Sequence, residues 1–163
     1  MGNHRNLTQI ALLAAFITVS GAIKLPSFIP GTEFQLSAPL AVSICYVFGA
    51  KIYLISGLIS SAVGLMLGTQ NILNVVIALV FRGAVLLCMA LMGKNKLSLL
   101  LSGPVGSALA RLVLAFWLDK AAYALLIAAA PGMVYTAICS APLSVVLYKI
   151  KIAAWGAEKE NAI

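Results

Sequence analysis

Apolar runs separated by short polar breaks dominate the chain, and six of them are predicted to span a membrane, although the second and third are short. The breaks are rich in Gly, Pro, Asn and Lys, residues that end helices and form turns. The predicted spans are 7–23, 34–48, 52–67, 72–92, 97–117 and 133–152. We therefore expect an all-α membrane protein in which residues 1–163 form a single six-transmembrane-helix bundle.

A further apolar stretch, 121–130, is too short to cross a bilayer. A helix of that length rises about 15 Å, whereas the hydrocarbon core is about 30 Å thick. Pro131-Gly132 then interrupts the run. We expect a short interfacial or re-entrant segment here, separate from the last span.

The composition excludes a water-soluble domain. Of the 163 residues, 63% are hydrophobic and 9% are charged, and the mean hydropathy is +1.08. Soluble domains are about 25% charged, so this chain has too few polar side chains to cover a surface that faces water.

The distribution of charge predicts the orientation. The chain has 11 Lys and Arg against 4 Asp and Glu, a net charge of +7. If the N-terminus is cytoplasmic, seven cations lie on the cytoplasmic side of the membrane: Arg5, Lys51, Lys94, Lys96, Lys149, Lys151 and Lys159. The outer loops then carry only Lys24 and Lys120. By the positive-inside rule we expect both termini in the cytoplasm. The excess of Lys and Arg over Asp and Glu then reflects the cytoplasmic loops of a membrane protein and does not indicate nucleic-acid binding.

Arg82 and Arg111 are the two charges inside the predicted spans, and all four acidic residues lie outside them. A cation at that depth is costly and needs a partner. A ligand with a carboxylate or phosphate would supply the counter-charge, because guanidinium bonds both oxygens of such a group. Alternatively, Arg82 bonds a neighbouring helix and Arg111 extends towards the interface.

Further polar residues fall on the same helix faces. Asn71, Asn74 and Arg82 lie within an arc of about 80°, and Ser107 and Arg111 share a second such arc. These residues are candidates to line a substrate cavity, although Asn and Ser in membranes also bond neighbouring helices.

The loop 24–37 is a candidate lid over this cavity and contributes Glu33 and Gln35. Trp117 is a candidate wall of the cavity, or an aromatic anchor at the membrane interface.

Small residues recur along the first span at Ala11, Ala15, Thr18 and Ala22. Small side chains allow another helix to approach closely. The stripe therefore serves packing within the bundle or docking of a separate membrane subunit.

Catalytic and metal motifs are missing. The only histidine is His4, the predicted spans contain no Asp or Glu, and there is no HExxH, CxxC or glycine-rich phosphate loop. We expect no enzyme, no metal and no cofactor.

The chain resembles the S components of energy-coupling factor (ECF) vitamin transporters. The resemblance lies in its six predicted spans, its predicted cytoplasmic ends and the segment Ala11-Leu12-Leu13-Ala14-Ala15. The resemblance implies that Ala11 and Ala15 form the AxxxA docking motif and that 24–37 closes over the substrate. Two segments look loosely like the biotin-specific branch: Pro30-Gly31-Thr32-Glu33-Phe34-Gln35-Leu36 and Phe48-Gly49-Ala50-Lys51.

This resemblance implies a binding subunit for a small, water-soluble, anionic vitamin in the prokaryotic plasma (inner) membrane. Its partners would be a transmembrane scaffold subunit and two cytoplasmic ATPases, and only those partners would use ATP. A stand-alone facilitator or channel and a non-transporting assembly subunit remain alternatives. The substrate is left open.

Overall fold

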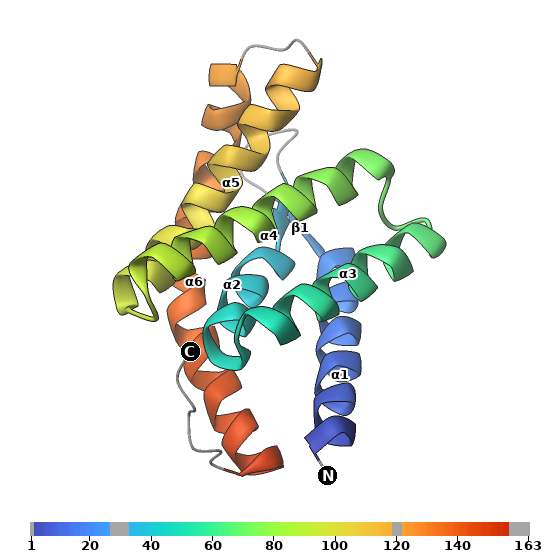
Figure 1. Cartoon of the computed structure of the whole chain (residues 1–163). Coiled ribbons are helices and arrows are strands. Elements are labelled where there is room, and N and C mark those ends of the chain that lie inside the picture. The colour runs from blue at the N-terminus through green and yellow to red at the C-terminus, as the bar shows by residue number, and fades with distance from the viewer. Residues whose placement is uncertain (1, 27–32, 119–121, 157–163) are drawn as a thin grey trace.

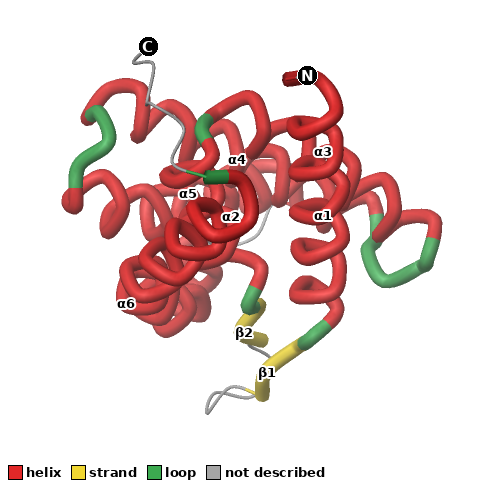
Figure 2. The backbone as a smooth tube through the Cα atoms, turned by 90° about the horizontal axis from the view of Figure 1, so that it is seen from below, coloured by secondary structure: helices red, strands yellow, loops and turns green. Residues whose placement is uncertain are grey.

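The protein is built of helices joined by tight turns, with one small hairpin (Figure 1). The computed structural model describes residues 2–26, 33–118 and 122–156. Within them the helices are α1 (Gly2–Ala22), α2 (Ser37–Phe48), α3 (Ala50–Met66), α4 (Ile72–Met92), α5 (Lys96–Leu118) and α6 (Ala122–Trp155). The strands β1 (Lys24–Pro26) and β2 (Glu33–Gln35) pair antiparallel between α1 and α2 (Figure 2).

Within the described ranges, three helices are long and apolar enough to cross a membrane by length and composition: α4, α5 from Lys96 to Phe116, and α6 from Leu126 to Trp155. The helices α2 and α3 are apolar but have only 12 and 17 residues. The helical, membrane-type fold predicted from the sequence is therefore confirmed. The count of six spans stays a prediction.

Glycines make the turns between several helices. A single residue, Gly49, separates α2 from α3 and has a φ of 87°. Gly93 ends α4 with a φ of 71°. A side chain would be strained in both conformations, so glycine is the residue that allows these abrupt changes of direction.

The last helix differs from the prediction. We expected a separate segment over 121–130 that ended at Pro131-Gly132, but α6 runs without a break from Ala122 to Trp155. Pro131 removes one backbone N–H from the helix, yet proline is tolerated inside membrane helices because neighbouring groups satisfy the freed carbonyl. At 34 residues, α6 is about 51 Å long. It is therefore longer than the hydrocarbon core is thick, and it must tilt or project.

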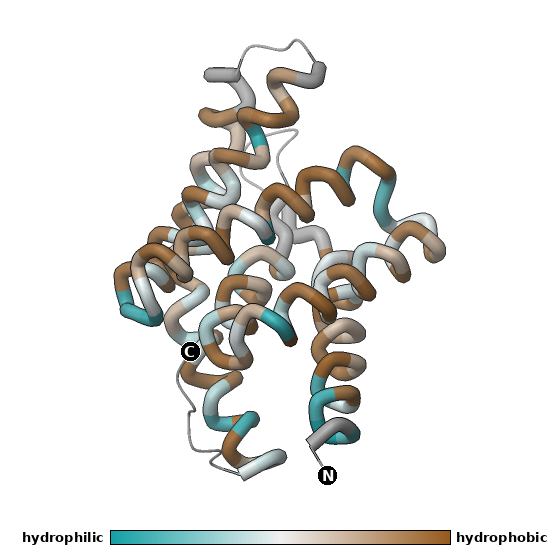
Figure 3. Tube along the Cα trace, viewed as in Figure 1, coloured by the Kyte–Doolittle hydropathy of each residue, from teal (hydrophilic) through white to brown (hydrophobic). Residues whose placement is uncertain are grey.

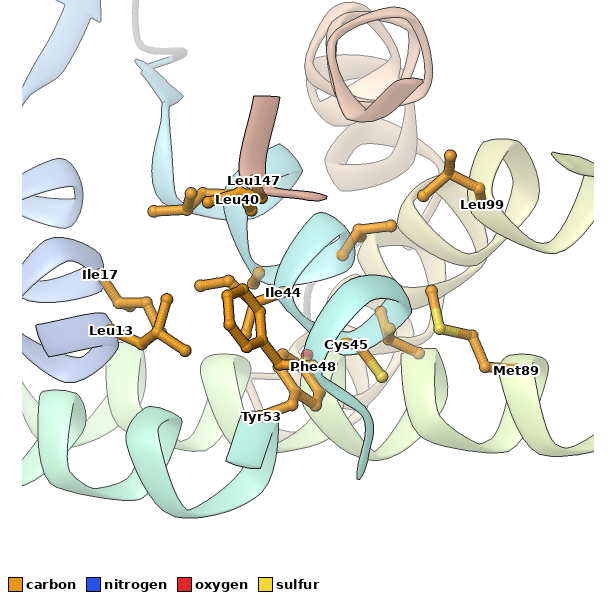
Figure 4. Close-up of a cluster of buried hydrophobic side chains, with 13 residues drawn as sticks. Leu13, Ile17, Leu40, Ile44, Cys45, Phe48, Tyr53, Met89, Leu99 and Leu147 are labelled. Carbon is orange, nitrogen blue, oxygen red and sulfur yellow. The ribbon is translucent and has the colours of Figure 1, made fainter. Parts of the chain in front are cut away.

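The short helix α2 forms the centre of the bundle. Eight of its 12 residues are buried, and Leu40, Val42 and Ile44 are almost fully enclosed. Figure 4 shows Leu40 and Ile44 packed with side chains of neighbouring helices, including Leu13, Tyr53 and Leu147. The central position of α2 explains how a helix too short to span a bilayer still organises the fold.

The surface of the molecule is apolar, unlike that of a soluble protein, and hydroxyl groups lie among the buried residues. Large apolar side chains such as Met66 and Phe116 are 86% and 91% exposed. In contrast, the buried residues include Ser43, Ser56 and Ser140, all at 0% exposure. Figure 3 shows hydrophobic residues along the outer helices and hydrophilic ones concentrated near turns. An apolar surface around a core with many hydroxyl groups suits a lipid solvent.

Candidate functional site

Arg82 belongs to α4, and its side chain lies against α3. The residue is 6% exposed. Its Nη1 donates to the Ser61 hydroxyl at 2.8 Å. The side chain also covers Gly57, where a Cβ atom would lie 2.4 Å from Nε. The sequence left two partners open for Arg82, a ligand or a neighbouring helix, and the structure gives it a bond to a helix.

The Arg82 guanidinium keeps further donor capacity. It carries five N–H groups, and within the described residues its hydrogen-bond partner is the neutral Ser61. A neutral hydroxyl does not balance the positive charge of a buried guanidinium, so a negatively charged partner would stabilise it. Ligand binding by Arg82 thus stays a prediction alongside its bond to α3.

Arg111 lies on α5 and is half-buried. Among the described residues it has no hydrogen-bond or ion-pair partner. Ser107, one turn earlier on α5, is also half-buried. Within the described residues, the guanidinium of Arg111 and the hydroxyl of Ser107 are therefore available to bond a ligand.

Asn71 and Asn74 lie at the start of α4 and are exposed. Asn71 is the N-cap, and its side-chain oxygen accepts a hydrogen bond from the Asn74 backbone N–H at 2.8 Å. A cap of this type satisfies one of the free N–H groups of the first turn. This local structural role for Asn71 differs from the substrate contact predicted for it from the sequence.

Three other candidates are only partly described. Glu33 and Gln35 belong to β2, where their Cα atoms pair with those of Pro26 and Lys24. Trp117 belongs to the last turn of α5. Their side chains, and the lid residues 27–32, lie outside the described residues.

Two apolar places bear on the expected cavity. α4 and α5 meet at residues such as Leu73, Val80 and Ala110, with no room for a water molecule between them. An open hollow lies along α1. Neither is lined by the polar candidates on α4 and α5, so the cavity expected between the two polar stripes stays a prediction.

The hollow along α1 is an open groove of about 420 Å³. Ala11, Ala15 and Thr18 of the predicted small-residue stripe line it, and Ile59 and Val63 of α3 form the opposite wall. Ala22 is exposed but lies outside the groove. The Thr18 hydroxyl lies 3.0 Å from the Ser60 hydroxyl, a contact that joins α1 to α3. We call this feature the α1 groove.

Several polar residues of interest were not selected from the sequence. Gly57 and Ser61, two small residues one turn apart on α3, contact the Arg82 side chain. This spacing was the signal that could have identified the face that meets Arg82. The Tyr53 hydroxyl and the Gln70 side-chain oxygen are buried without a hydrogen-bond partner.

The chain has a relative among characterised proteins, although no protein-family model matches it. Protein BioX from Lysinibacillus sphaericus is 47% identical over 145 residues, which cover 89% of this chain and 87% of that protein. The fold defines a helical protein of the membrane type. Within that class, the chain belongs to the same family as Protein BioX.

Proposed function

We propose that the chain is the substrate-binding membrane subunit of an ECF-type uptake system for a small anionic vitamin. The name of its relative, Protein BioX, is consistent with a biotin-related role. Biotin combines a carboxylate with a polar ring, which matches the cationic and polar candidates in the helices. The protein binds its substrate without chemical change and is not an enzyme.

The α1 groove is the observation that carries this proposal. A subunit that works alone has no reason to keep small residues on an open face, because larger apolar side chains pack better against neighbours or lipid. Ala11 and Ala15 are exposed in the groove, which supports docking over packing within the bundle. They leave room for a helix of a scaffold subunit to approach closely. Two cytoplasmic ATPases bound to that scaffold would supply the energy.

The binding site takes its charge from arginine. In this proposal Arg111, which lacks a partner among the described residues, binds the acid group of the vitamin, and Arg82 completes the positive field. Ser107, Asn74, Gln35, Glu33 and Trp117 are the further candidates to contact the substrate. Asn71 shapes the rim as the cap of α4.

The proposed arrangement has six spans and both ends in the cytoplasm of a prokaryotic cell. The hairpin end of the molecule, with the α3–α4 turn, then faces outwards. Substrate captured at that end passes inwards only after the subunit meets its scaffold. The chain itself needs no cofactor.

The first experiment separates binding from docking. Ala11→Leu combined with Ala15→Leu fills the groove with larger side chains. The expected result is loss of biotin uptake in cells that contain the partner subunits, with unchanged biotin binding by the purified variant in a thermal-shift assay. The control is Ala90→Leu combined with Ala141→Leu, because these alanines are exposed on α4 and α6 and lie outside the groove.

Each alternative function has its own outcome. Unchanged uptake by the groove variant indicates a stand-alone facilitator or channel. Failure of the wild-type protein to bind biotin or any other carboxylated vitamin indicates an assembly subunit. Either result contradicts the proposal.

A further inference from the structure

Gln70 occupies an unusual position in the turn between α3 and α4. Its side-chain oxygen is buried and has no hydrogen-bond partner among the residues that the structure describes. The amide lies against Gly64, where a Cβ atom would be 3.0 Å from Cδ and 3.3 Å from Oε1. Glycine at position 64 therefore makes room for the amide.

The surroundings place this amide at the base of the hairpin. Its Nε2 lies 3.8 Å from the position that a Cβ atom on Gly21 would occupy, and the same position is 3.8 Å from Ser37 Oγ. Gly21 is in the last turn of α1, and Ser37 begins α2. The hairpin connects these two helix ends. Gln70 thus lies where α1, α2 and α3 meet beneath β1 and β2.

The backbone of Gln70 is held firmly. The N–H groups of Thr69 and Gln70 both donate to the Gly64 carbonyl, at 3.0 and 3.1 Å. The next residue, Asn71, is fixed as the cap of α4. The side chain therefore projects from a fixed backbone position, and its remaining freedom is that of its own three torsion angles.

An unpaired buried carbonyl is a cost to stability that an apolar side chain such as leucine would avoid. Buried polar atoms without partners are rare and call for an explanation. A site built to bond a substrate has such atoms when it is empty. A change in the side-chain torsion angles of this partly buried residue would carry the amide away from Gly64 and bring its oxygen to the exposed side.

We propose that Gln70 is a substrate-recognition residue whose side-chain oxygen accepts a hydrogen bond from an N–H group of the substrate. This inference rests on the proposed function and refines it. The substrate class becomes an organic acid that carries an N–H donor of the amide or ureido type, with the acid group at arginine and the N–H group at Gln70.

The test uses two acids that share a pentanoate chain. Biotin has ureido N–H groups on its ring, whereas the ring of lipoate has none. Gln70→Leu is expected to weaken biotin binding about tenfold, the scale of one lost hydrogen bond, and to leave lipoate binding unchanged. The melting temperature should stay the same or rise, because leucine removes the unpaired carbonyl. The control is Gln9→Leu, which makes the same change at a buried position near the other end of α1.

The outcomes distinguish this inference from the proposed function. If wild-type protein binds neither acid, the proposed function fails, and the inference fails with it. If wild-type protein binds biotin and Gln70→Leu binds it equally well, only the inference is overturned. A variant that melts at a lower temperature and loses both acids in equal measure shows that Gln70 is structural, which also overturns the inference.

Discussion

The contact between Arg82 and Gly57 yields a prediction at the scale of single residues. A Cβ atom at position 57 would lie 2.4 Å from Nε and 2.9 Å from Cδ of Arg82. Because Arg82 is buried and bonded to Ser61, it cannot move aside freely. Gly57→Ala should therefore destabilise the protein by about 1–3 kcal/mol, as measured by equilibrium unfolding in mixed detergent micelles.

Gly83 provides the matched control for that prediction. It follows Arg82 on α4 and has open space where a Cβ atom would be added. Gly83→Ala should leave stability unchanged or raise it by about 1 kcal/mol, since alanine favours the helix. Equal loss of stability in both variants would argue against a close contact of Arg82 with position 57.

Sequence reasoning identified Arg82 as a buried cation in need of a partner, and the structure places it between two helices. It did not identify Ser61 as the partner. The free-energy cost of a charge in lipid depends on its depth in the bilayer, and that depth can be predicted from the position of the residue in its span. The partner depends on the rotation of α3 about its own axis, which is set by packing against α1 and α2.

At the scale of helices, the packing of α5 against α6 depends on Gly103. A Cβ atom there would lie 2.5 Å from Cγ2 of Thr136 and 3.4 Å from its Cβ. Gly103→Ala should therefore lower stability by about 1–3 kcal/mol. Thr136→Ser removes Cγ2 and keeps the hydroxyl that bonds the Gly132 carbonyl. When Gly103→Ala is combined with Thr136→Ser, the loss of Cγ2 should relieve most of the strain that alanine creates at position 103.

The measurement for this pair is a double-mutant cycle on unfolding free energies. A favourable coupling of about 1 kcal/mol or more is expected for side chains in contact. Additive effects of the two substitutions would mean that α5 and α6 do not meet at this point.

Helix ends could be predicted from the sequence where the turn residues themselves stop the helix. The span predicted over 72–92 coincides with α4 because Asn71 and Gly93 mark its ends in the sequence itself. The break predicted at Pro131 was wrong because proline only weakens one turn. Whether a helix continues through it depends on the packing around α6, which no local pattern reveals.

At the scale of the whole molecule, the helix ends that carry cations are linked to one another. Arg5 of α1 donates to the Trp155 carbonyl at the end of α6. Lys151 of α6 donates to the Val47 carbonyl near the end of α2 at 3.1 Å and lies 5.6 Å from the centre of the Phe48 ring. Figure 1 shows the start of α1, the end of α6, and the α2–α3 and α4–α5 turns in the lower half of the molecule.

This arrangement leads to a prediction about orientation. The cations at the linked ends are Arg5, Lys51, Lys94, Lys96, Lys149 and Lys151. Because cationic loops stay in the cytoplasm, His4→Cys should be hidden from a membrane-impermeant maleimide in intact cells. Thr69→Cys, exposed in the α3–α4 turn, should react. Both variants are made in a chain whose three native cysteines are replaced by alanine.

Permeabilised cells supply the control, because both cysteines should then react. Residues 4 and 69 are separated by three proposed spans, and an odd number of crossings places them on opposite sides. If α2 and α3, which are shorter than the bilayer is thick, instead form a buried pair that does not cross, one crossing remains and the labelling pattern is the same. Lys51→Cys distinguishes these topologies: the cysteine stays protected if α2 crosses back to the cytoplasm, and it reacts from outside if α2 does not.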